Sequence, residues 1–360
     1  MDRRAARAAV IDLGYPIVVA DSVRTPLRAL LRERGQRFAV LCDANVTDLA
    51  ETLTRGPKRI GVFAFDLGER RKCLRTVESV LDRLTAAGAD RQTAIVGVGG
   101  GVAGDLFGLA AALFMRGVPY AHVATTLVSM VDAAIGGKNG VDLAGGKNLA
   151  GTFRDPIGVF APVRALYTLP LRHVREGLAE MVKHAAIAGG ETFEKLERLA
   201  PHDLFRWPWE AVVSDSVAVK TAIVHADRHE HGRREVLNLG HTFAHAIESA
   251  SRYRVSHGAA VSIGLRGAGL LALSTGRFSR EDHLRMLALL TLLGLPMRMR
   301  ESPAAVLAAM DADKKKRDGR LRFVLPNAIG DVEYGVRVPV SRVRAVLERL
   351  ARPPGNEEFR

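Results

Sequence analysis

The 360-residue sequence predicts an α/β protein with an N-terminal, Rossmann-like parallel-sheet domain and a C-terminal, mainly α-helical domain. Two observations support this fold class. Before residue 170, strand-like and helix-like segments alternate, as they do in doubly wound parallel sheets. Beyond that point, apolar residues recur at helical spacing in one long segment after another. We therefore expect domains at residues 1–169 and 170–352, followed by a disordered tail at 353–360.

The elements of the N-terminal domain follow from its apolar pattern. Apolar runs that end in polar or glycine-rich turns indicate strands at residues 38–45, 59–66, 93–101 and 119–127. Helical spacing indicates helices at 71–88 and 105–117, the first of which ends at a glycine. The order strand, glycines, helix, strand over residues 93–127 indicates parallel pairing.

The C-terminal domain is expected to contain mostly helices. Helical spacing covers residues 171–190, 209–230, 242–253, 257–276, 280–294 and 341–352, and a short strand-like stretch covers 321–326. A cleft between two such domains is a usual place for a ligand.

Composition and charge limit the classes of partner. The net charge is +13, but the basic residues are spread along the whole chain, without stacking aromatics, a helix-turn-helix or a zinc-finger pattern. This distribution favours a pocket for an anionic substrate over nucleic-acid binding. No window of about 18 uninterrupted apolar residues predicts a membrane span. The two cysteines, Cys42 and Cys73, are too few for a disulfide framework, so we expect a cytoplasmic protein.

A glycine loop is the first candidate binding motif. Gly99, Gly101 and Gly104 fit GxGxxG spacing between a strand and a helix, where free amides can meet a pyrophosphate. Tight packing alone remains the alternative. Asp105 is placed to cap the helix or face a cofactor. The acidic residue usual about 20 positions further on is not evident, so this is not a standard Rossmann fingerprint.

A lysine-rich segment at residues 131–152 is the second candidate binding motif. It holds two Gly-Lys pairs, ending at Lys138 and Lys147, and Asn148 follows the second pair. Exposed amides and two point charges suit phosphate or carboxylate. The alternative is a flexible basic surface loop. The asparagine after each lysine excludes a Walker motif.

Three histidines and an acidic residue suggest a metal site. His241 and His245 are spaced i,i+4 and share a helix face, His257 follows, and Glu180 lies on an earlier helix with Lys183. A catalytic zinc takes three protein ligands and keeps one open position. Spacing makes His241 and His245 the first pair, but does not show which of the three histidines does not bind. His229 and His231 fit a solvated charged turn better.

Six motifs occur in an order that resembles 3-dehydroquinate synthase and related sugar-phosphate cyclases over nearly the whole chain. They are GGGVAGD, the segment 132–148, GLAEMVK, RREVLNLGHTFAHAIE, SHGAAV and DKK. The resemblance implies a Rossmann-like domain, a helical domain and a homodimer. It also implies metal ligands at Glu180, His241 and His257, which makes His245 a residue that contacts the substrate instead.

The resemblance further assigns site residues at matching positions. The catalytic residues it implies are Asp132, Lys138, Lys183, Lys220, Arg234, Asn238 and His245. The substrate-binding residues it implies are Arg116, reaching the site of a partner subunit, and Lys147, Asn148, Lys314 and Lys315. The NAD-binding residues it implies are Asp43, Asn45, Glu69, Lys72, Gly100, Gly101, Val102, Asp105, Thr125, Thr126 and Thr168.

The implied reaction is the cyclisation of 3-deoxy-D-arabino-heptulosonate 7-phosphate to 3-dehydroquinate in the shikimate pathway. It proceeds by transient oxidation, phosphate elimination, reduction, ring opening and aldol closure, with NAD and a divalent zinc or cobalt ion. NAD is not consumed, and the enzyme is a lyase.

Several alternatives remain. Arg234 and Lys220 suit a substrate carboxylate, which argues against the 2-deoxy-scyllo-inosose and valiolone-type cyclases. The substrate of an aminodehydroquinate synthase has the same carboxylate, so the sequence hardly distinguishes that enzyme from a dehydroquinate synthase. A metal-dependent alcohol or glycerol dehydrogenase would need no phosphate site. The chain departs from the family pattern at Asn139, Asp142, Ala244 and residues 153–156. These departures leave open which substrate the chain takes.

Overall fold

The computed structural model describes residues 9–34, 37–230, 232–316, 321–355 and 358, without the side chains of 313–316. The chain divides into two compact units. The first holds residues up to Val174 together with Pro208–Thr221, and the second holds Arg175–Trp207 and the chain from Ala222 onward. No feature of the sequence indicates that Pro208–Thr221 groups with the first unit.

The first unit is built on a seven-stranded sheet with the order β1-β2-β9-β6-β5-β3-β4. The strands are β1 (Ala9–Asp12), β2 (Pro16–Ala20), β3 (Phe38–Asp43), β4 (Arg59–Phe65), β5 (Ala94–Gly99), β6 (Tyr120–Ala124) and β9 (Gly158–Pro162). Only the β1–β2 pair is antiparallel, and every other pair in this sheet is parallel. The parallel sheet predicted from the alternating pattern is confirmed.

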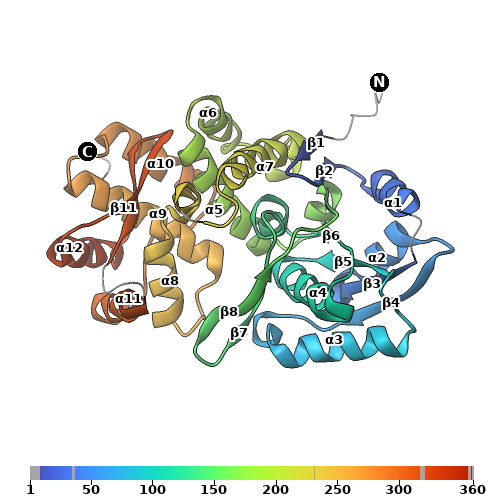
Figure 1. Cartoon of the computed structure of the whole chain (residues 1–360). Helices are drawn as coiled ribbons and strands as arrows, with labels where there is room; N and C mark the ends of the chain where they lie inside the picture. The colour runs from blue at the N-terminus through green and yellow to red at the C-terminus, as the bar shows by residue number, and fades with distance from the viewer. Residues whose placement is uncertain (1–8, 35–36, 231, 317–320, 356–357, 359–360) are drawn as a thin grey trace, which may run out of the picture. The chain divides into compact units, whose positions relative to one another are not determined.

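Helices cover both faces of this sheet (Figure 1). One apolar core includes residues of α3 (Leu74–Ala86) and α4 (Gly101–Leu113), and the other includes residues of α1 (Arg24–Glu33) and α2 (Thr47–Thr54). Strand β3 serves both cores, because successive side chains point to opposite faces. Leu41 belongs to the α3–α4 side, whereas Val40 and Cys42 belong to the other. Burial on both faces explains why its sequence is continuously apolar.

Most of the lysine-rich segment forms a β-hairpin, so the alternative of a flexible surface loop is wrong. Strand β7 (Lys138–Leu143) pairs antiparallel with β8 (Gly146–Phe153). Val141 is fully buried in the core that α3 and α4 share. The side-chain nitrogen Nδ2 of Asn139 donates to the backbone carbonyl oxygens of Gly137 and Arg154, at 3.0 Å from each. Glycines and lysines hide this pairing in the sequence because they carry little strand propensity.

The second unit is mainly helical, as predicted. Its helices are α5 (Leu171–Ala188, from Arg175), α6 (Gly190–Leu199), the end of α7 (Trp209–Ala226), α8 (His241–Ala250), α9 (His257–Ser274), α10 (Arg280–Leu292), α11 (Pro303–Lys316) and α12 (Val340–Leu350). A hairpin of β10 (Phe323–Ala328) and β11 (Asp331–Val336) accompanies them. Helix α9 is buried along nearly its whole length and contacts α8, α10, α12 and β10.

The C-terminal tail differs from the disorder expected at 353–360 at one described residue. The Glu358 carboxylate accepts from Nε and Nη2 of Arg266, a fully buried arginine on α9, at 3.1 Å and 2.5 Å. The remaining guanidinium nitrogen, Nη1, donates to the carbonyl oxygens of Met297 and Arg352. A buried arginine needs such partners, and the sequence of the tail does not show that it supplies one.

Candidate active site

The glycine loop lies at the carboxyl end of β5, at the start of α4. Gly100 is the N-cap residue of α4, and as a glycine it has no side chain that could accept from the first amides of the helix. A Cβ on Gly100 would lie 2.9 Å from the Thr126 side chain, and one on Gly99 would lie 2.4 Å from the Cβ of Ala103 and 3.4 Å from the Cβ of Asp43. The loop therefore has to be glycine, and it brings the uncapped amides of α4 beside Asp43 and Thr126. Uncapped helix amides are a fitting partner for a pyrophosphate.

Other predicted cofactor residues lie around this loop. Asp43 accepts from the backbone and side-chain nitrogens of Asn45, at 2.9 Å and 2.8 Å, and so fixes the turn after β3. The backbone N–H of Thr125 donates to the carbonyl oxygen of Gly99 at 2.9 Å. Thr168 is separate from the loop in sequence, and its hydroxyl donates to the carbonyl oxygen of Ala165.

Three distant segments of the first unit meet at Lys72. Its ammonium lies 2.5 Å from the Asp105 carboxylate and 2.6 Å from the side-chain oxygen of Asn148, and Lys72 is only 7% exposed. Burial raises the pKa of Asp105 to about 6, although the Lys72 charge acts in the opposite direction. Lys147, beside Asn148, lies 2.7 Å from the Glu69 carboxylate. Five residues predicted from the family pattern thus form one charged cluster around the hairpin.

The hairpin is tied to this cluster by Asp142, a departure from the family pattern. Its carboxylate accepts from the backbone N–H of Asn148 at 2.8 Å, and its own N–H donates to the carbonyl oxygen of Lys72. Asn148 adopts a left-handed backbone conformation with φ of 53°. Asp142 therefore stabilises a strained asparagine. Lys138, in contrast, lies over the Phe153 ring at 5.9 Å, on the same hairpin.

A second pair of predicted residues in the first unit is Asp132 and Lys220. The Lys220 ammonium lies 2.6 Å from the Asp132 carboxylate, and Lys220 is 6% exposed. Asp132 lies in the short π-helical turn Ser129–Ala133. Arg116 follows α4, is exposed, and has a left-handed backbone with φ of 66°.

The second unit brings together the three predicted metal ligands. One potential ligand atom from each of Glu180, His241 and His257 lies within 4.8 Å of the other two. Oε1 of Glu180 is 3.0 Å from Nε2 of His257 and 3.8 Å from Nε2 of His241. The three residues lie far apart along the chain, on α5, α8 and α9, respectively. One carboxylate and two imidazoles in this arrangement fit a catalytic zinc or cobalt ion.

In each histidine, a contact at one ring nitrogen orients the ring and leaves the other nitrogen for a metal ion. Nδ1 of His241 lies 3.3 Å from the carbonyl oxygen of Leu239, which favours a proton on Nδ1 and a lone pair on Nε2. Burial, followed by the Lys183 charge, lowers the pKa of His241 to about 3 and keeps the ring neutral. Burial also acts to lower the pKa of His257, but contacts with Glu180 and Glu248 outweigh it and raise the pKa to about 10. A metal ion bound at His257 would therefore displace a proton.

The remaining predicted residues of this unit surround the ligands. The Lys183 ammonium lies 2.5 Å from Oε2 of Glu180. The His245 ring packs edge-on against the His241 ring, with 5.3 Å between centroids, one helical turn along α8. His245 thus lies beside Glu180, His241 and His257, which we call the metal group, but is not part of that group. Lys314 and Lys315 lie on α11, but their side chains fall outside the described part of the chain.

Arg234 and Asn238 lie on the short helical turn Arg233–Asn238. Arg234 is 3% exposed, and its Nη1 donates to the carbonyl oxygen of Arg228 at 2.7 Å. Sequence reasoning missed Asp227, whose carboxylate accepts from the backbone N–H groups of Gly232 and Arg234. Asp227 lies seven residues before Arg234 in a charged stretch, and only folding shows that it closes this loop. Of the two histidines assigned to a charged turn, His229 is exposed and His231 lies outside the described residues.

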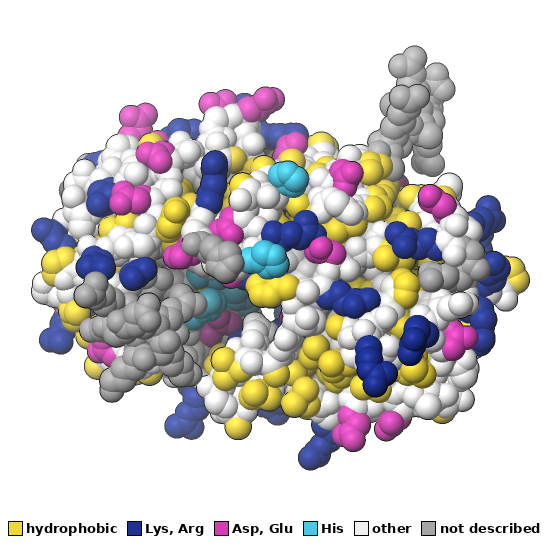
Figure 2. Space-filling model, viewed as in Figure 1, with side chains coloured by type: hydrophobic (Ala, Val, Ile, Leu, Met, Phe, Trp, Pro, Cys, Tyr) yellow, Lys and Arg dark blue, Asp and Glu magenta, His cyan; other side chains and the backbone are white. Residues whose placement is uncertain are grey.

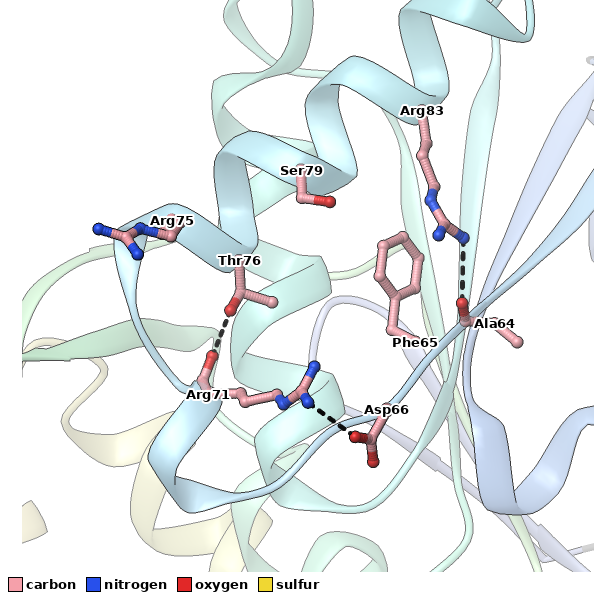
Figure 3. A pocket seen from close by; sticks show the side chains of 8 residues that line it. All are labelled: Ala64, Phe65, Asp66, Arg71, Arg75, Thr76, Ser79 and Arg83. Carbon is pink, nitrogen blue, oxygen red and sulfur yellow. Dashed lines mark hydrogen bonds and ion pairs between the residues drawn. The ribbon is translucent and has the colours of Figure 1, made fainter.

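A cavity of about 410 Å³ lies on the first unit, and three arginines contribute to its lining (Figure 3). Arg71 pairs with Asp66 at 2.9 Å, and Arg83 covers the Phe65 ring and donates to the carbonyl oxygen of Ala64. None of the residues predicted for the site lines this cavity.

No helix in the described ranges of the chain combines the length and the apolar character needed to cross a membrane.

Comparison with known proteins gives a consistent result along the chain. The N-terminal model of 3-dehydroquinate synthase matches residues 62–176, and the C-terminal model matches residues 177–316. A relative from Gloeobacter violaceus, named 3-dehydroquinate synthase, is 43% identical over 349 residues, which cover 93% of this chain and 96% of the relative.

Two solved structures share the fold throughout. The 2-epi-5-epi-valiolone synthase of Streptomyces hygroscopicus subsp. jinggangensis, with NAD⁺ and Zn²⁺ bound, is 29% identical, with a TM-score of 0.84 over 96% of this chain and 99% of that one. A 2-deoxy-scyllo-inosose synthase complexed with carbaglucose-6-phosphate, NAD⁺ and Co²⁺ is 25% identical, with a TM-score of 0.84 over 95% and 99%. On the strength of its full-length relative and the two matching models, the chain belongs to the 3-dehydroquinate synthase family.

Proposed function

We propose that this chain is a carbon–oxygen lyase that converts 3-deoxy-D-arabino-heptulosonate 7-phosphate into 3-dehydroquinate and phosphate, as a step of the shikimate pathway. One observation carries the proposal: the 43% identity to a relative named 3-dehydroquinate synthase extends over 96% of that relative. The two cyclase structures with NAD⁺ and Zn²⁺ or Co²⁺ support the same cofactors here.

The residues of the first unit suit NAD. Bound NAD and a bound metal ion supply reversible hydride transfer and Lewis-acid polarisation of an oxygen, respectively. The uncapped amides at Gly100–Val102 would donate to the pyrophosphate, and Asp43 would accept hydrogen bonds from a ribose. Lys72, held by Asp105 and Asn148, would present a fixed positive charge beside the cofactor.

The cations of the chain suit a substrate with both a carboxylate and a phosphate. Arg234 is buried and donates to the Arg228 carbonyl, and a guanidinium is the side chain best suited to a carboxylate. In the first unit, Lys220 is held by Asp132 and offers a positive charge of the kind that suits a carboxylate. Lys138, Lys147 and Asn148 on the first unit offer groups that suit a phosphate, and His245 offers one on the second unit.

The carboxylate-directed cations favour a dehydroquinate-type substrate over those of the inosose and valiolone cyclases. The departures at Asn139 and Asp142 have structural partners within the hairpin and at Lys72, so they do not by themselves indicate another substrate. An aminodehydroquinate synthase would use the same cations, and we treat it as an outcome of the experiment below.

We further propose a cytoplasmic homodimer in which Arg116 reaches the partner subunit. Apolar side chains gather on the visible face around the β7–β8 hairpin (Figure 2), where Leu149 and Phe153 are exposed. Leu113 and Met115, just before Arg116, are exposed as well. Such a patch is typical of an interface. Light scattering should give twice the chain mass, and Arg116→Ala should lower activity without dissociating the dimer.

The test of the proposed reaction is phosphate release from 3-deoxy-arabino-heptulosonate 7-phosphate, with catalytic NAD⁺ and zinc or cobalt, and product identification by mass. Dehydroquinate formed without net NADH supports the proposal. If no phosphate is released, the substrate is wrong, and the amino analogue and then sedoheptulose 7-phosphate are offered next. NADH that accumulates without phosphate would identify a dehydrogenase.

A further inference from the structure

The first residue of α9, His257, is flanked by two hydrogen bonds to one carboxylate. The Ser256 hydroxyl donates to Oε1 of Glu176, and the Gly258 N–H donates to Oε2 of Glu176 at 2.6 Å. Glu176 therefore holds the backbone on both sides of His257. It also satisfies an N-terminal amide of α9 that the Ser256 side chain does not cap.

This contact joins two elements of the metal group directly. Glu176 lies four residues before Glu180 on α5, so both side chains emerge from the same face of that helix. A Cβ on Gly258 would lie 2.4 Å from the Cα of Glu176, so α9 begins directly against the α5 backbone. The helix that supplies Glu180 thereby also fixes the position of His257.

A second carboxylate faces the His257 ring. Oε2 of Glu248 lies 3.6 Å from Nδ1 of His257, while Nε2 of the same ring lies 3.0 Å from Glu180. Glu248 is 3% exposed, and its carbonyl oxygen accepts from the Ser251 hydroxyl and from the Tyr253 N–H. The turn from α8 to α9 thus places Glu248 against the nitrogen that points away from Glu180.

We propose that Glu176 and Glu248 are positioning residues for His257 in the metal centre, an inference that rests on the proposed metal dependence. Glu248 lies against the Nδ1 side of the ring, so that Nε2 is held facing Glu180 and the metal position. Glu176 acts through the backbone, because it fixes the first turn of α9 relative to Glu180. Neither residue is a metal ligand. Outer carboxylates of this kind tune ligand orientation and metal affinity.

The experiment measures cobalt affinity by chelator competition, together with the visible spectrum of the cobalt-loaded full chain. Glu176→Gln and Glu248→Gln should each weaken cobalt affinity about 10- to 100-fold. The spectrum should change most in Glu248→Gln, and Glu248→Asp should recover part of the lost affinity. Thermal unfolding without metal reports general stability separately.

Glu197→Gln is the matched control. Glu197 also lies in the second unit and forms a two-bond ion pair with Arg285, at 3.0 Å and 2.7 Å, but it touches none of the metal group. This variant should lose stability and keep native cobalt affinity. If Glu176→Gln does not fold, Ser256→Ala replaces it, because that change removes only the hydroxyl that donates to Glu176.

The outcomes separate the two proposals. A native chain that binds no cobalt would contradict the proposed metal dependence. A native chain that binds cobalt, with Glu176 and Glu248 variants of native affinity and spectrum, would overturn the positioning role alone. Equal losses in the Glu197 control would show that affinity follows general stability, which also overturns it.

Discussion

At the scale of single residues, the metal group shows how strongly a few side chains depend on their neighbours. Glu180 is completely buried, and its charge is compatible with burial because Lys183, His241 and His257 surround it. The same surroundings keep His241 neutral and ready to donate a lone pair. A change at any of these positions therefore affects both the proposed metal site and a buried charge.

We expect His241→Ala to abolish metal binding and reduce turnover by at least about 1,000-fold, because a three-ligand site loses one ligand. Metal content after dialysis and phosphate release are the measurements. His225→Ala, at an exposed histidine of α7, is the control and should retain both properties. An active variant at position 241 with a full complement of metal would disprove its role as a ligand.

His122 makes stability depend on pH. It is buried, with Nδ1 2.9 Å from the Tyr120 hydroxyl and Nε2 3.1 Å from the Ser129 hydroxyl. Burial lowers its pKa from 6.5 to about 4. Below pH 6.5 the unfolded chain therefore takes up a proton that the folded chain does not, so stability is lost as pH falls toward 4.

The expected loss from His122 approaches about 3 kcal/mol over that interval. Buried His283 adds a loss of the same sign, because burial lowers its pKa to about 4 as well. Denaturant unfolding at pH 7 and pH 5 should show a smaller loss for His122→Gln than for the native chain. An equal pH dependence in the two proteins would show that His122 is not responsible.

At the scale of elements, close helix contacts determine where the site residues lie. A Cβ on Gly264 of α9 would lie 2.2 Å from the carbonyl oxygen of Gly240, which immediately precedes α8. Gly240 itself has φ of 80°, a left-handed conformation that favours glycine. The next residue is His241, so this crossing of α8 and α9 sets the distance between two of the three proposed ligands.

Gly264→Ala should therefore destabilise the second unit by about 2 kcal/mol or more and weaken cobalt binding, because backbone atoms have to separate. Gly267→Ala on the same helix is the control. The nearest neighbours of its Cβ would be side-chain atoms of Leu350 and Phe243, at 3.1 Å, and these can move. Thermal unfolding and cobalt titration of both variants test the difference. Equal effects at the two positions would argue against the backbone contact as the cause.

At the scale of the whole molecule, the chain separates the residues proposed for NAD from those proposed for the metal. The first unit holds the glycine loop and the Lys72 cluster, and the second holds Glu180, His241 and His257. The two ligands should therefore leave different signatures on the chain, whatever the arrangement of the units.

We expect NAD⁺ alone to slow hydrogen exchange mainly around residues 99–105 and 125–126, and zinc alone to slow it mainly around 176–183 and 241–258. Ligand-dependent protection follows from preferential binding to the folded state. Hydrogen-exchange mass spectrometry with each ligand separately is the measurement. Zinc that protects the glycine loop as strongly as its own residues would show that the two units respond as one.

Much of this protein could be predicted from local pattern. The strands β3, β4, β5 and β6 and the helices α3, α5, α9 and α12 lie where apolar spacing predicts them, because each buries an apolar face or stripe. Family motifs then identified Glu180, His241 and His257, which the structure brings together. Spacing alone favoured His241 with His245, because an i,i+4 pair is visible in a sequence and a contact between α5 and α9 is not.

The sequence by itself therefore determined the fold class, the glycine loop and the set of candidate residues, since these depend on local periodicity and short motifs. Only the tertiary structure decided that the lysine-rich segment is a hairpin, and that Lys72, Asp105 and Asn148 meet. It also decided that Glu176 and Glu248 hold His257, and that Arg266 pairs with Glu358. The physical reason is the same in each case: a charged side chain gains its partner from a segment far away along the chain, and burial then makes that partner necessary.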